Sequence, residues 1–123
     1  MTKNQKQVLI NIDKIYEMLF NEKKYVVEFA EASIQSFNEF SQHYSTFLLN
    51  RDMENLRKAG HKIKPVAQML DLEIILDEYE KAKVMLIEEK PKKDLESSVE
   101  IINGICNSAI DEFNSIIENL KQT

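Results

Sequence analysis

The sequence predicts an all-α fold, an antiparallel four-helix bundle with a short N-terminal helix. The 123 residues include only two glycines and two prolines, too few for the many turns of a β-sandwich or barrel. Apolar residues instead recur at steps of three and four over several long segments, as one face of an amphipathic helix requires. With 43% hydrophobic and 30% charged residues, the chain can bury a core, and we expect one domain over residues 1–123.

The first two helices are expected in the first 49 residues. A short helix at residues 13–20 is predicted with Asp13 as its cap, and residues 1–11 before it are expected to be frayed or extended. A long helix is predicted at residues 22–49, where only Ser33 interrupts the apolar stripe. The stripe consists of Val26, Phe29, Ser33, Phe37, Phe40, Tyr44 and Phe47.

Three further helices follow, separated by a turn at residues 50–52, a break at Asp71 and a polar run at residues 88–93 that contains Pro91. Their stripes are Leu56, Ala59, Ile63, Val66, Ala67 and Leu70; then Leu72, Ile75, Leu76, Tyr79, Ala82 and Leu86; and finally Leu95, Val99, Ile102, Cys106, Ala109, Phe113, Ile116 and Leu120. Each apolar face needs a partner, and the short connections favour up-and-down neighbours.

Cysteine usage and hydropathy predict a cytoplasmic protein without membrane insertion. The single cysteine, Cys106, can form neither an intramolecular disulfide nor a cysteine-based zinc cage. The N-terminus lacks a long apolar stretch, and charged residues interrupt every apolar segment. Cys106 lies on a predicted core seam and is expected to be inert, and His43, beside an apolar stripe, is expected to be partly buried.

The third predicted helix differs from the others in charge. Residues 55–70 contain no acid, and four cations give them a charge of +4. The rest of the chain carries −9, so the whole chain has a net charge of −5. These cations are Arg57, Lys58, Lys62 and Lys64. A basic patch on an acidic protein suggests an acidic partner.

His61 lies in the middle of this patch. At about 100° per residue, it falls roughly 140 to 160° from the apolar stripe and should point outward. A neutral imidazole nitrogen can attack phosphorus, and nearby ammonium groups can stabilise phosphoryl oxygens. The alternative is that these residues form only the solvated face of an amphipathic helix.

The segment LRKAGHKIKPVAQMLDLEIILDEYEKAK, residues 56–83, resembles the signature of histidine-containing phosphotransfer (HPt) domains. In this family an exposed histidine is followed three residues later by lysine and then by a small residue. The resemblance implies that His61 accepts the phosphoryl group and that Lys64 steadies it. More loosely, the order of helices extends the likeness over residues 12–121.

Three positions depart from the family pattern. Pro65 follows the lysine where most members have glycine, Gly60 precedes the histidine where they have alanine, and Asp71 replaces a glycine about ten residues after the histidine. Proline inside a helix removes a hydrogen bond, here to the carbonyl of His61, so a local kink is expected.

The resemblance implies a phosphoryl carrier without autokinase activity, moving a phosphoryl group between receiver-domain aspartates in a multistep His-Asp phosphorelay. Its partners would be a response-regulator receiver domain and a hybrid sensor kinase. The chain would need no cofactor, since Mg²⁺ would be held by the receiver domain. Partner contacts are expected from Arg57, Lys58, Lys62, Pro65 and Gln68.

The alternative function is that of a non-catalytic helical-bundle binding module, which docks a receiver domain or another acidic protein without being phosphorylated. Other chemistry lacks the required residues. Neither histidine has an acid three residues before it, so no di-iron or other metal site is predicted. No glycine-rich phosphate loop is present, and nucleic-acid binding is not expected of so acidic a chain. We expect a monomer.

Overall fold

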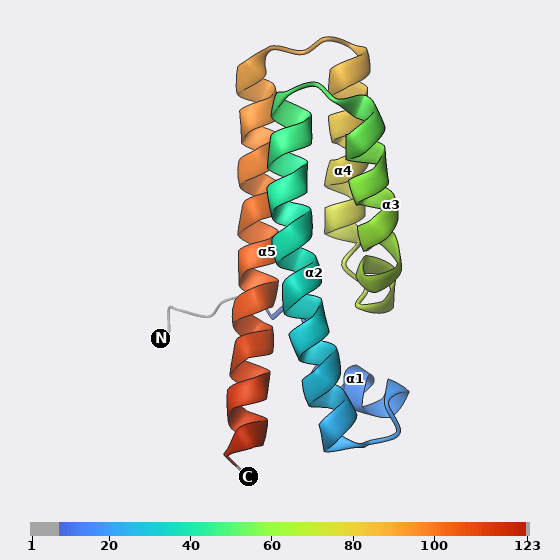
Figure 1. The fold of residues 1–123 in the computed structure, drawn as a ribbon, viewed down its shortest axis with the longest axis vertical. Coiled ribbons are helices and arrows are strands. Elements are labelled where there is room, and N and C mark those ends of the chain that lie inside the picture. Colours follow the sequence, from blue (N-terminus) through green and yellow to red (C-terminus); the bar gives the residue numbers. More distant parts are fainter. Residues whose placement is uncertain (1–7, 123) are drawn as a thin grey trace.

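The computed structural model describes residues 8–122. Its helices are α1 (Ile12–Met18), α2 (Lys23–Leu49), α3 (Met53–Met69), α4 (Glu73–Ile87) and α5 (Lys92–Lys121). The long helices α2 and α5 pack along each other, α3 and α4 cover one half of this pair, and α1 lies beside the other end of α2 (Figure 1). No helix within residues 8–122 has the length and hydropathy needed to cross a membrane. The all-α bundle with a short N-terminal helix is confirmed.

The core is centred on the pairing of α2 with α5. The fully buried ring of Phe113 in α5 stacks on Phe37 of α2, with ring centroids 6.3 Å apart, and meets the edge of Phe29 at 6.2 Å. The predicted stripe of α5 is buried from Leu95 to Phe113. On α2, Ala30 and Leu48 are buried where Phe29 and Phe47 were expected, and these two rings are half-buried at the edge of the core.

Helix starts differ from the prediction in two places. The cap of α1 is Asn11, whose side chain accepts a hydrogen bond from the backbone of Lys14, and not Asp13, which lies inside the helix. At the other end of the chain, α5 begins directly after Pro91, so the predicted loop at residues 88–93 is shorter than expected. Proline is well tolerated there because the first helical positions need no backbone donor.

Helices α1 to α4 end in the same left-handed backbone conformation without glycine. The residues concerned are Phe20 (φ 61°), Arg51 (φ 55°), Asp71 (φ 57°) and Glu89 (φ 54°). At the end of α3, the N–H of Asp71 bonds to the carbonyl of Gln68 and that of Leu72 bonds to Ala67, the Schellman pattern. The break predicted at Asp71 is confirmed, and this aspartate adopts the conformation that most often selects glycine.

The side chains of two of these turn residues also bind other parts of the fold. The guanidinium of Arg51, between α2 and α3, donates to the carbonyl of Lys90 between α4 and α5, at 2.7 Å. The carboxylate of Asp71, between α3 and α4, forms an ion pair with Lys14 of α1. Both ends of α3 are therefore attached to another part of the fold.

The segment before α1 is held against α5. The backbone N–H groups of Leu9 and Ile10 donate to the carboxylate of Glu112 at 2.8 to 3.1 Å, and Ile10 is only 4% exposed. Residues 8–10 lie outside any helix but are anchored, so the expectation of fraying does not describe them. For residues 1–7 that expectation falls outside the described part of the chain.

A buried polar network joins three of the helices. The hydroxyl of Ser98 in α5 donates to the carboxylate of Glu78 in α4 at 2.6 Å and accepts from the hydroxyl of Tyr44 in α2 at 2.7 Å. All three residues are buried. Because each polar group has a partner, the network avoids the cost of burying unsatisfied groups.

Alkaline pH should destabilise the bundle through two buried acids, Cys106 and Tyr44. Burial raises the pKa of the Cys106 thiol to about 12 and the pKa of Tyr44 well above its usual value of 10. At a pH between the ordinary pKa of each group and its raised pKa, the group is ionised in the unfolded chain but neutral in the folded chain. The free energy of unfolding should therefore fall as pH rises above about 9.

Urea unfolding at pH 8 and at pH 10.5 measures this loss of stability. The variants Cys106→Ala and Tyr44→Phe should each lose less stability between the two pH values than the native chain loses. Unchanged pH dependence in both variants would contradict the burial of these groups.

Candidate functional site

The orientation of α3 determines which of its side chains reach solvent. It buries five residues, Leu56, Ala59, Gly60, Ile63 and Ala67, which fall within an arc of about 100° at 100° per residue. His61 lies about 150° from the middle of that arc and is exposed. The outward position expected from helical phase is therefore found.

All seven residues expected at the site are exposed, and we call them together the His61 face. They are His61, Lys64, Arg57, Lys58, Lys62, Pro65 and Gln68. Gly60 contacts Tyr79 of α4 and Lys62 pairs with Glu39 of α2, and these two contacts define the two flanks of α3. Helical phase places Arg57, Lys64 and Gln68 on the α4 flank of His61 and the other three on the α2 flank.

Two of the four cations on this face are paired with acids. The Nζ of Lys62 lies 2.9 Å from Oε1 of Glu39, and the Nζ of Lys58 lies 3.8 Å from Oε2 of Glu54. The hydrogen bond and charge of Lys62 lower the pKa of Glu39. Within residues 8–122 the side chains of Arg57 and Lys64 form no ion pair. The unpaired positive charge thus lies on the α4 flank of His61.

Lys64 is the cation best placed to act together with His61. Residues three apart on a helix are surface neighbours, with Cβ atoms about 5 to 6 Å apart. The flexible lysine stem lets the ammonium group approach a group attached to the imidazole. Exposure and the absence of a competing acid within the described residues leave Lys64 available for such an anion.

Pro65 lies inside α3 without ending it, because the helix continues to Met69. The helical partner of the His61 carbonyl would be the N–H of residue 65, which proline lacks. The turn that carries His61 therefore has one helical hydrogen bond fewer than an ordinary turn.

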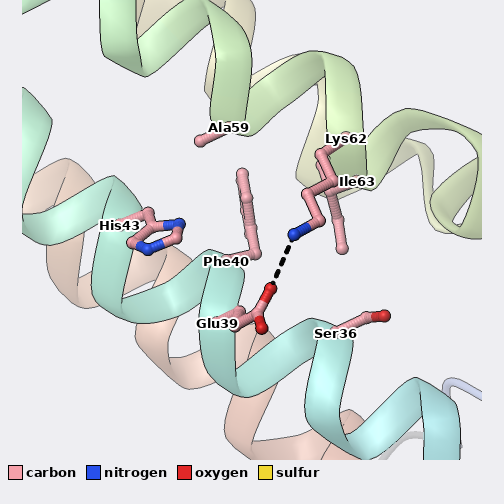
Figure 2. Close-up of a pocket in the computed structure, with 7 residues that line it drawn as sticks. All are labelled: Ser36, Glu39, Phe40, His43, Ala59, Lys62 and Ile63. Atoms are coloured by element: carbon pink, nitrogen blue, oxygen red, sulfur yellow. Dashed lines mark hydrogen bonds and ion pairs between the residues drawn. The ribbon is translucent and has the colours of Figure 1, made fainter.

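A groove between α2 and α3 borders the His61 face on its α2 flank. It is lined by Ser36, Glu39, Phe40, His43, Ala59, Lys62 and Ile63. Figure 2 shows Lys62 reaching from α3 to Glu39 on α2, while the ring of Phe40 points into the groove toward Ala59. The sequence alone could not reveal the pairing of Lys62 with Glu39, because the two residues are 23 positions apart and on different helices.

His43 lies at one edge of this groove. Its ring packs against that of Phe47, tilted by 31° and with centroids 5.4 Å apart, and the residue is exposed. The expectation that His43 is partly buried is therefore wrong. The buried face of α2 passes through Phe40 and Tyr44 instead, which leaves His43 outside it.

Comparison of the chain with family models, with curated proteins and with solved structures gives no match. The chemistry open to the site is set by its own residues. An exposed imidazole beside two unpaired cations can attack an electrophilic phosphorus and stabilise the oxygens around it.

His61→Gln should leave the fold unchanged, because the side chain is exposed and forms no hydrogen bond or ion pair within residues 8–122. Surface substitutions of this kind change the free energy of unfolding by about 0.5 kcal/mol or less. Thermal unfolding followed by circular dichroism should give a melting temperature within about 3 °C of the native value. A larger drop would mean that His61 contributes to packing.

Proposed function

We propose that the protein is a histidine phosphotransfer protein, a carrier that receives a phosphoryl group on His61 from a receiver-domain aspartate and passes it to another in a multistep phosphorelay. The observation that carries the proposal is the exposed His61 with the unpaired Lys64 one turn further along α3. Their type and spacing match the HPt signature, and the helical bundle provides the rigid support that such a signature requires.

The transfer step is a substitution at phosphorus. The lone pair of one imidazole nitrogen of His61 attacks the phosphorus of an aspartyl phosphate on the partner. The N–P bond forms while the P–O bond to the aspartate breaks, and the aspartate leaves as a carboxylate. The other ring nitrogen keeps its proton, so no proton has to move in this step. The reverse reaction delivers the phosphoryl group to a second aspartate.

The remaining residues of the His61 face bind and orient the partner. Lys64 stabilises the phosphoryl oxygens, and Arg57 adds a second unpaired charge on the same flank. Lys58, Lys62, Pro65 and Gln68 complete the docking surface, and positive charge on this face speeds encounter with an acidic partner. The receiver domain and a hybrid sensor kinase are the partners, and the receiver holds the Mg²⁺.

The second candidate is a binding module that docks an acidic protein without phosphorylation. It is favoured by the pairing of Lys58 with Glu54 and of Lys62 with Glu39, which leaves fewer cations for phosphoryl oxygens. The two candidates differ in one property, which is whether the imidazole of His61 forms a covalent bond to phosphorus.

Incubation with a radiolabelled, phosphorylated receiver domain tests this difference. Label should move to the native chain in an acid-labile and alkali-stable form, as expected of a phosphohistidine, and His61→Gln should accept none. His43→Gln is the matched control, because His43 is the other histidine and is also exposed, and it should accept label normally. Label that persists in His61→Gln but disappears in His43→Gln would overturn the assignment, and docking without any label would favour the binding module.

Lys64→Ala should slow transfer in both directions, because it removes the charge that stabilises the phosphoryl oxygens. Lys64→Glu should slow it further by adding a negative charge beside the nearly dianionic group. Lys81→Ala, a change at an exposed lysine of α4, should have no effect. Rapid-quench time courses with the receiver measure the rates, and added salt should narrow the difference between the two Lys64 variants. Native rates in Lys64→Glu would exclude a role for this lysine.

A further inference from the structure

Gly60, the residue before His61, is the point at which α4 comes closest to α3. A Cβ atom built on Gly60 would lie 2.1 to 2.6 Å from three ring atoms of Tyr79, so the aromatic ring occupies the space of a side chain. Glycine inside a helix costs about 1 kcal/mol relative to alanine. The contact accounts for the glycine, because any other residue would push the ring and the helix apart.

Tyr79 itself is held firmly in α4. It is 8% exposed, and the Nζ of Lys83 lies 4.6 Å from the centroid of its ring. Lys83 is in turn paired with Glu80 at 3.2 Å. The ring that contacts Gly60 is thus buried against the bundle and is not a freely moving surface group.

The same tyrosine reaches the backbone of the turn that carries His61. Its hydroxyl donates a long hydrogen bond of 3.5 Å to the carbonyl of Arg57, four residues before His61. On the other side of His61, Pro65 removes the hydrogen bond to the histidine's own carbonyl. Tyr79 therefore supports α3 in the turn where the helix is least supported by its own backbone.

We propose that Tyr79 is a positioning residue for His61, which fixes the turn of α3 behind the imidazole through its contacts with Gly60 and the Arg57 carbonyl. This inference rests on the proposed phosphotransfer function. The attacking nitrogen must lie in line with the leaving oxygen, and a misplacement of about 1 Å can slow a reaction by about a hundredfold. The hydrogen bond from Tyr79 to the His61 face goes to the backbone carbonyl of Arg57 and not to a side chain, so the loss of Tyr79 affects transfer within the complex and not docking.

The test compares Tyr79→Leu with Phe113→Leu, a change in a fully buried α5 residue that packs on α2. Both variants should melt at lower temperatures than the native chain. Tyr79→Leu should slow phosphoryl transfer at saturating receiver by about tenfold or more, with the Kd for the receiver within about twofold. Phe113→Leu should retain the native transfer rate. Amide hydrogen exchange at His61 should accelerate more in Tyr79→Leu than in Phe113→Leu.

A second pair of variants tests the contact itself. Gly60→Ala should slow transfer because its methyl group displaces the ring of Tyr79. The double variant Gly60→Ala with Tyr79→Leu should transfer at about the rate of Tyr79→Leu alone, because both changes remove the same contact. If the two changes slow transfer independently, their effects multiply in the double variant, and that result would contradict a shared contact.

The outcomes separate the two proposals. A native chain that accepts no label on His61 overturns the proposed function, and with it the positioning role. A native chain that is labelled normally, with equal transfer rates and equal His61 exchange in Tyr79→Leu and Phe113→Leu, overturns the positioning role alone.

Discussion

The rotation of α3 about its own axis is the constraint on which the candidate site depends. Leu56 and Ala67 are fully buried and Ile63 is 2% exposed, and burying these three fixes the direction of every other side chain on the helix. A rotation by one residue, about 100°, would carry a lysine into the core, where an unpaired charge is very costly. The exposure of His61 therefore follows from the burial of the opposite side of α3. The contact of Tyr79 with Gly60 adds packing from α4 on this buried side.

Much of this fold could be predicted from the sequence, because helical periodicity is a local signal. The stripe from Leu95 to Phe113 and the break at Asp71 are read directly from neighbouring residues. The errors occur where two local patterns compete. Asn11 and Asp13 are both good caps. On α2, Ala30 and Leu48 are buried more deeply than Phe29 and Phe47, and this small rotation of the helix depends on its packing against other helices.

The site could be predicted in part for the same reason. Exposure of His61 and Lys64 follows from spacing within one helix, whereas the partners of α3 lie on other helices. Nothing in residues 55–70 indicates that Glu39 neutralises Lys62 or that Tyr79 fills the space beside Gly60. A glycine in the middle of a helix was the available signal for the second contact, since its cost has to be offset by packing.

The two attachments at the ends of α3 also affect how the helix can bind another protein. Arg51 holds the turn before it to the turn between α4 and α5, and Asp71 holds the turn after it to α1. Each contact is exposed and contributes little to global stability. Glycine, the usual residue at a left-handed position after a helix, has no side chain and could form neither contact. A helix fixed at both ends loses little conformational entropy when a partner settles on it. Association can then proceed close to a rigid-body encounter, with the binding free energy little reduced by ordering of the backbone.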